Sequence, residues 1–137
     1  MERHKKTIAI VVVFALAISA FGIMAYAYDN EVTSTLYGVT IKGKNYISSD
    51  RKSSSSTSWT SSMSADVTVN AVFYWYDFAL EEFGTTNLAG GGSGSWTVSV
   101  PFISSREYYR VISDHDFWVS GHHSGFDDLT LDITSNP

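Results

Sequence analysis

Residues 66–78 read DVTVNAVFYWYDF, and this stretch decides the class of fold. Every odd position from 67 to 75 is apolar, whereas the even positions from 66 to 70 are polar. Successive side chains of a β-strand point to opposite faces, so this alternation predicts a strand with one buried face. From Val72 onward the second face becomes apolar as well, and we expect a central strand that is covered, at least in part, on both faces.

The same alternation recurs in five other stretches, which are residues 32–41, 45–49, 95–102, 107–120 and 128–133. In residues 107–120 the apolar parity includes Tyr109, Val111 and Phe117, and the central triplet Asp114-His115-Asp116 indicates a bulge or a turn. No stretch after residue 27 carries a sustained helical periodicity, so the rest of the chain is predicted to be all-β.

Three segments are predicted to connect or flank these strands. Lys42-Gly43-Lys44 is typical of a tight turn, and Gly90-Gly91-Gly92-Ser93-Gly94 is typical of a mobile hairpin loop. Residues 48–64 hold ten serines in seventeen positions, which suits either a flexible linker or a polar edge strand. We favour a loop over residues 50–55 and an edge strand from about Ser56, because Trp59 shares the parity of the apolar residues that follow.

About seven short strands in 110 residues, separated by Gly, Ser, Asn and Asp, predict an antiparallel two-sheet sandwich. An immunoglobulin-like architecture is our first choice, and a small β-barrel is the alternative. The whole of residues 28–137 is expected to form this single domain.

The composition excludes several classes of protein. The chain has 137 residues, of which 44% are hydrophobic and 17% are charged, so it is not a disordered chain. It has no Cys, which excludes disulfides, thiolate metal sites and thiol catalysis. A net charge of −5 argues against binding to nucleic acid, because that function needs clustered Lys and Arg.

The first 27 residues resemble an export signal. Arg3, Lys5 and Lys6 precede an uncharged run over residues 7–24, and alanines follow at positions 25 and 27. We therefore expect residues 1–27 to be a signal peptide, cleaved between Ala27 and Tyr28, and the protein to be secreted. The alternative is an uncleaved membrane anchor over residues 7–27 with the domain outside. Removal of the leader would take the net charge to −7.

Two groups of residues are candidates for a functional site. Imidazole and carboxylate groups can bind metal ions, and such groups concentrate near the C-terminus at Asp114, Asp116, His122 and His123, although no known ligand spacing is matched. Large aromatic rings can stack on a sugar or a partner protein, and surface candidates of this kind are Tyr74, Tyr76 and Tyr108.

These observations predict an exported binding or interaction protein without catalytic activity or cofactor. Its partner would be a protein or a carbohydrate at the cell surface, and it would touch a membrane only through an uncleaved N-terminal segment. A secreted antimicrobial or toxin-like protein is the first alternative. A metal-dependent enzyme that uses the C-terminal Asp and His residues is the second.

Overall fold

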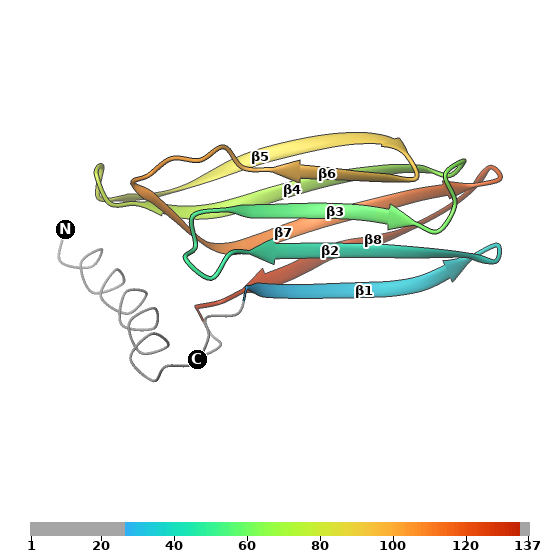
Figure 1. Cartoon of the computed structure of the whole chain (residues 1–137), viewed down its shortest axis with the longest axis horizontal. Coiled ribbons are helices and arrows are strands. Elements are labelled where there is room, and N and C mark those ends of the chain that lie inside the picture. Colours follow the sequence, from blue (N-terminus) through green and yellow to red (C-terminus); the bar gives the residue numbers. More distant parts are fainter. Residues whose placement is uncertain (1–26, 135–137) are drawn as a thin grey trace.

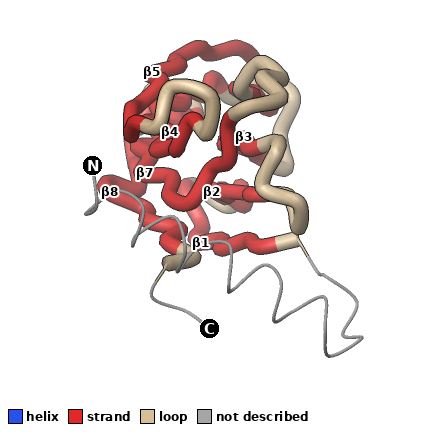
Figure 2. Tube along the Cα trace, turned by 90° about the vertical axis from the view of Figure 1, so that its left-hand side faces the viewer, coloured by secondary structure: helices blue, strands red, loops and turns tan. Residues whose placement is uncertain are grey.

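The computed structural model describes residues 27–134, which form two four-stranded antiparallel sheets packed face to face (Figure 1). The first sheet, sheet A, has the strand order β1 (Tyr28–Leu36), β2 (Val39–Ile47), β3 (Ser54–Thr60), β6 (Ser95–Ser99). The second, sheet B, has the order β5 (Glu82–Ser93), β4 (Asp66–Asp77), β7 (Arg106–Val119), β8 (His122–Asp132). The two layers are visible end-on in Figure 2.

The predicted all-β sandwich is confirmed, and the barrel alternative is wrong because the two sheets do not close on each other. The described residues hold eight strands, one more than we expected. Strand β4 is central in sheet B, between β5 and β7, as the two apolar faces of its second half predicted. Strand β3 pairs with β6 and β4 pairs with β7, so strands distant in sequence hold each sheet together.

The apolar interior consists of two clusters. The larger one holds Ile47, Val69, Ala71, Phe73, Trp75, Val98, Val100, Tyr108, Val111, Leu131 and Ile133. The smaller one holds Ile41, Val67 and Phe117. Polar residues and a glycine separate the two clusters. On β7, Ser113 and His115 lie between Val111 of the larger cluster and Phe117 of the smaller one. On β2, Gly43 and Asn45 separate the two clusters in the same way.

The interior between these clusters is a polar layer in which each side chain has a hydrogen-bond partner. His115 is completely buried, with Nδ1 2.8 Å from Ser58 Oγ and Nε2 2.8 Å from Ser113 Oγ. Asn45 Oδ1 accepts hydrogen bonds from Ser56 Oγ and Ser113 Oγ, both at 2.7 Å. Buried polar groups are tolerated when they are paired in this way.

Each of the two serines that contact His115 has one hydroxyl hydrogen and a second acceptor, which is Thr68 O for Ser58 and Asn45 Oδ1 for Ser113. A neutral His115 therefore donates from one ring nitrogen to one of these serines, and the other serine shares its hydrogen with the second ring nitrogen. Burial lowers the pKa of His115 to about 4, although Asp114 and Asp116 act to raise it, so the ring is neutral at pH 7.

The turn predicted at Lys42-Gly43-Lys44 is wrong. These residues lie inside β2, and the hairpin turn is instead at Tyr37 and Gly38, whose φ angles of 49° and 74° suit a two-residue hairpin. Gly43 faces the interior, where a Cβ would lie 2.8 Å from ring carbons of His115. The glycine is there because the imidazole packs against the backbone of β2.

The mobile loop predicted at residues 90–94 is also wrong, since Gly90, Gly91 and Gly92 belong to β5 and pair with β4. Gly90 and Gly92 share one face of the strand, and the indole of Trp96 from β6 lies against both. A Cβ at Gly90 would overlap Trp96 Nε1, and one at Gly92 would lie 2.8 Å from the ring. The glycines make room for an aromatic side chain from the other sheet.

The serine-rich segment forms an interior strand of its sheet, β3, and not the edge strand that we predicted, because β2 and β6 flank it. The preceding loop covers residues 48–53. The inward-facing side chains of β3 are the serines Ser54, Ser56 and Ser58, together with Thr60. Trp59 therefore points outward, opposite to the prediction.

Two irregularities alter which side chains reach the interior. Where β7 pairs with β4, Tyr109 is left out of the register, so Tyr108 rather than Tyr109 faces the core. Where β7 pairs with β8, Asp127 and Asp128 lie opposite Asp114, so the extra residue of this bulge belongs to β8. The central triplet of β7, which we predicted to be a bulge or a turn, is continuous strand in regular register with β4.

Candidate functional site

The three candidate tyrosines do not form a surface platform. Tyr108 has no exposed surface and Tyr76 is only 3% exposed, so their placement at the surface is wrong. The ring of Tyr76 packs edge-on against Phe78 and Phe83, and burial raises its pKa.

The third candidate, Tyr74, is half-buried on β4. The guanidinium of Arg110 lies 5.3 Å from its ring centre, and the ring of Tyr109 lies 6.3 Å away. Arg110 in turn contacts Asp132, with 2.6 Å between Nη2 and Oδ2. Two residues of β7, Tyr109 and Arg110, therefore lie beside the ring of Tyr74, which keeps part of its surface exposed.

The four metal-binding candidates lie on neighbouring strands but do not converge. His123 Nε2 is 2.8 Å from Asp116 Oδ1, whereas the ring of His122 stacks on Tyr37 with 3.7 Å between centroids. Asp114 Oδ1 accepts a hydrogen bond from the backbone N–H of Asp128 at 2.9 Å. Within residues 27–134, no three imidazole or carboxylate groups are close enough to hold a metal ion.

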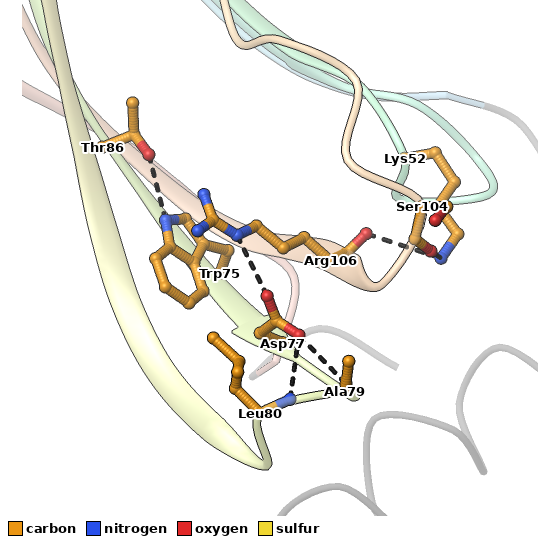
Figure 3. Close-up of polar contacts among 8 residues, drawn as sticks. All are labelled: Lys52, Trp75, Asp77, Ala79, Leu80, Thr86, Ser104 and Arg106. Atoms are coloured by element: carbon orange, nitrogen blue, oxygen red, sulfur yellow. Dashed lines mark hydrogen bonds and ion pairs between the residues drawn. The ribbon is translucent and has the colours of Figure 1, made fainter.

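At one end of the sandwich, side chains from β4, β5 and β7 form a cluster and contact one another (Figure 3). The guanidinium of Arg106 lies 3.8 Å from the ring centre of Trp75, and its Nε is 3.3 Å from Asp77 Oδ2. Trp75 Nε1 donates to Thr86 Oγ1 at 3.0 Å. Because each group faces another group of the protein, this cluster stabilises the fold and leaves little for a ligand.

Asp77 also orders the turn that follows β4. Its Oδ1 accepts hydrogen bonds from the backbone N–H groups of Ala79 at 3.0 Å and Leu80 at 3.1 Å (Figure 3). Burial acts to raise the pKa of Asp77, but these hydrogen bonds and those from Ser105 and Arg106 outweigh it and hold the pKa below its usual value.

The outer face of sheet A contains an open groove of ≈ 260 Å³, which we call the Trp59 groove. Its lining residues come from three adjacent strands and are Glu31, Lys42, Lys44, Thr57 and Trp59. The indole of Trp59 is 39% exposed and forms one side of the groove. An exposed aromatic ring beside charged and hydroxyl side chains combines an apolar face with hydrogen-bonding groups.

The alternation of β2 and β3 builds this groove. Gly43 and Asn45 face the interior, so Lys42 and Lys44 must face outward. In the β2–β3 register Lys42 is opposite Trp59 and Lys44 is opposite Thr57. Trp59 was not among the predicted site residues, because the serines of this strand were expected to face the solvent and in fact face the interior. The alternation of Lys42 and Lys44 was the signal that could have identified the outer face.

The charges in the groove are loosely paired. Lys42 Nζ lies 3.6 Å from Glu31 Oε1 and 5.3 Å from the ring centre of Trp59. Lys44 Nζ lies 3.8 Å from Asp29 Oδ2 on the same face. Both ion pairs are exposed to solvent and contribute little stability, so a ligand can replace either partner at low cost.

Comparison of the chain with protein-family models, curated proteins and solved structures gives no match. Among residues 27–134 no helix is long and apolar enough to cross a membrane.

Proposed function

We propose that this chain is an exported, non-catalytic module that binds carbohydrate in the Trp59 groove. The observation that carries the proposal is the exposed indole of Trp59 beside a surface of ammonium, carboxylate and hydroxyl groups. A sugar ring has an apolar face of C–H groups and a rim of hydroxyls. Such a ligand can stack on the indole and exchange hydrogen bonds with Glu31, Lys44 and Thr57.

The composition of the groove favours a carbohydrate over a protein partner. The core of a protein–protein interface is typically depleted of Lys and Glu, whereas Glu31, Lys42 and Lys44 line the groove beside Trp59. A polyhydroxylated ligand, in contrast, needs many hydrogen-bonding groups spread over a shallow surface.

Export remains part of the proposal. The basic residues near the N-terminus, the uncharged run and the alanines at positions 25 and 27 support a cleaved signal peptide over residues 1–27. This segment lies outside the described residues, except for Ala27 itself. The retained alternative is a membrane anchor over residues 7–27 that displays the same domain outside the cell.

We also propose that the sandwich has an immunoglobulin-like architecture. The support is the face-to-face packing of two antiparallel sheets with connections that cross between them. The strand orders 1-2-3-6 and 5-4-7-8 differ from the immunoglobulin orders ABED and CFG, so the proposal concerns the layered architecture alone and implies no relationship in sequence.

The binding proposal is tested with a matched pair of tryptophans. Trp59 is 39% exposed on the outer face of sheet A, and Trp118 is 38% exposed on β7 of sheet B. Protein with Trp59→Ala and protein with Trp118→Ala are compared with the unchanged chain on an array of oligosaccharides. We expect Trp59→Ala to abolish binding and Trp118→Ala to retain it. If the protein binds no saccharide, or if Trp59→Ala binds as well as the original, the proposal fails.

Export is tested by intact-mass measurement of protein from the culture medium and from washed membranes of cells that express the full chain. A mass that corresponds to residues 28–137 in the medium supports a cleaved signal peptide. A full-length mass confined to the membranes replaces it with the anchored alternative, and full-length protein in the cytoplasm contradicts both.

A further inference from the structure

The basic residues of the described chain are distributed unevenly, and this bears on the ligand of the Trp59 groove. Residues 27–134 contain six Lys and Arg side chains. Four of them are engaged elsewhere. Arg51 is buried with 2% exposure, Lys52 Nζ donates to Ser104 O at 2.8 Å, Arg106 contacts Asp77 and Arg110 contacts Asp132.

The two remaining cations, Lys42 and Lys44, both line the groove. They lie two residues apart on one face of β2, which places their Cα atoms about 7 Å from each other. Their carboxylate partners are at 3.6 and 3.8 Å, beyond the length of a short charge-assisted hydrogen bond. A carboxylate on a ligand can therefore approach either ammonium group more closely than Glu31 or Asp29 does.

A second groove lies at the first residues of β3, where inward-facing Ser54 and Val100 and outward-facing Ser55 all line it. It has a volume of ≈ 180 Å³ and is lined by Tyr46, Ser53, Ser54, Ser55, Ser99 and Val100. Ser55 is on the same face of β3 as Thr57 and Trp59, and four residues of a strand span about 13 Å. The connecting surface consists of hydroxyls, including Thr57 Oγ1 and Thr97 Oγ1, which are 2.8 Å apart.

From this arrangement we infer that the ligand is an acidic oligosaccharide, with carboxylates on its sugar rings, that lies along β3 from Trp59 toward Tyr46. One ring stacks on the indole of Trp59, and its carboxylate binds between Lys42 and Lys44. The following rings contact the hydroxyls of Thr57 and Ser55 and reach the second groove. This inference rests on the proposed carbohydrate function and specifies its ligand.

The test uses oligogalacturonic acids of increasing length and the methyl esters of the same oligomers, which keep the sugar but lose the charge. Affinities are measured by calorimetry with the protein purified from cells that express the full chain. We expect the acid to bind about tenfold more tightly than the ester, as a hydrogen bond to a charged group contributes. We expect the affinity for the acid to rise from the monomer to the trimer and to fall with added salt.

Variants separate the contribution of charge from that of shape. Lys44→Gln should weaken binding of the acid by about tenfold and leave the ester unchanged, while Lys44→Arg should keep most of the affinity because it keeps the positive charge. A Tyr46→Ala variant should weaken the trimer but not the monomer, since only the longer ligand reaches the second groove.

The outcomes distinguish the inference from the function on which it rests. Equal affinity for acid and ester, or binding of neutral oligosaccharides alone, overturns the acidic ligand and leaves the carbohydrate function standing. Binding that does not depend on length overturns the extended footprint. If neither these oligomers nor any member of the array binds, the proposed function fails as well.

Discussion

The imidazole of His115 lies inside the sandwich with no exposed surface, between serine hydroxyls of two different strands. Burial disfavours the charged form of a histidine, and the pKa of His115 is lowered to about 4. In the unfolded chain the same ring has its ordinary pKa of about 6.5. The difference links protonation of this residue to the stability of the whole fold.

We predict that the free energy of unfolding decreases as the pH is lowered from about 6.5 to about 4. In this window the unfolded chain binds a proton at His115 and the folded chain does not, so acid favours unfolding. The loss contributed by this residue is about 3 kcal/mol in total, and above pH 6.5 its contribution is fully present. Urea unfolding at several pH values measures it.

The control for this prediction is His115→Gln, in which every other ionisable group still titrates. The variant should be less stable at pH 7, because it disturbs the hydrogen bonds with Ser58 and Ser113, but its stability should change less between pH 6.5 and 4. An equally steep decrease in both proteins would show that other groups cause the acid sensitivity.

The close packing of Gly43 on this ring leads to a second prediction. Gly43→Ala should destabilise the fold by about 1–3 kcal/mol, because its Cβ would lie 2.8 Å from the imidazole of His115. In a His115→Ala background the same substitution should cost much less, since the ring is gone. Thermal unfolding of the four proteins in this double-mutant cycle measures the coupling, and additive effects would contradict the packing.

At the scale of elements, strand β5 shows how a glycine run can be ordered. A Gly-rich sequence loses much conformational entropy on folding, and its backbone is held here by pairing with β4 on one side. This entropic cost is offset by a residue of the other sheet, because the indole of Trp96 on β6 packs over Gly90 and Gly92. An aromatic ring over backbone glycines supplies the apolar contact that the strand itself lacks.

We predict that Gly90→Ala lowers stability by about 1–3 kcal/mol, because the added methyl group overlaps the Trp96 indole. The neighbouring Ala89 is exposed on the opposite face of β5, so Ala89→Ser is the matched control and should change stability by less than about 0.5 kcal/mol. Chemical denaturation followed by tryptophan fluorescence compares the two. If both variants are neutral, Trp96 does not pack on this strand.

At the scale of the whole molecule, the sandwich depends on pairs that are far apart in the chain. Ser55 pairs with Ser99 across β3 and β6, and Asp66 pairs with Trp118 across β4 and β7. The chain must lose loop-closure entropy to bring such distant residues together before their contacts can stabilise it, and long-range pairing therefore slows folding.

We therefore predict that the domain folds on the millisecond-to-second timescale, as other sandwiches with non-local contacts do. Stopped-flow refolding from urea, monitored by tryptophan fluorescence, measures the rate. Folding within microseconds would indicate that local hairpins, and not the β3–β6 and β4–β7 pairs, determine the rate.

The sequence by itself determined the class of fold. Alternation over residues 66–78 requires only that neighbouring side chains point to opposite faces, which is a local property of an extended backbone. The absence of helical periodicity after residue 27 and the short spacing between strands then favoured a two-sheet sandwich over the alternative of a small β-barrel. The position of Asp114 and Asp116 opposite His115 followed from the same local rule.

The tertiary structure decided which face of each polar strand became interior, and with it the candidate site. The inward orientation of the β3 serines depends on partners that other strands provide, since Ser56 bonds Asn45 and Ser58 bonds His115. No pattern within β3 itself records those partners, and Trp59 is assigned to the surface only once β3 is paired with β2, where Lys42 lies opposite it. The same holds for the bulge at Tyr109, because a single unpaired residue reverses the parity of the strand and only pairing with β4 reveals it.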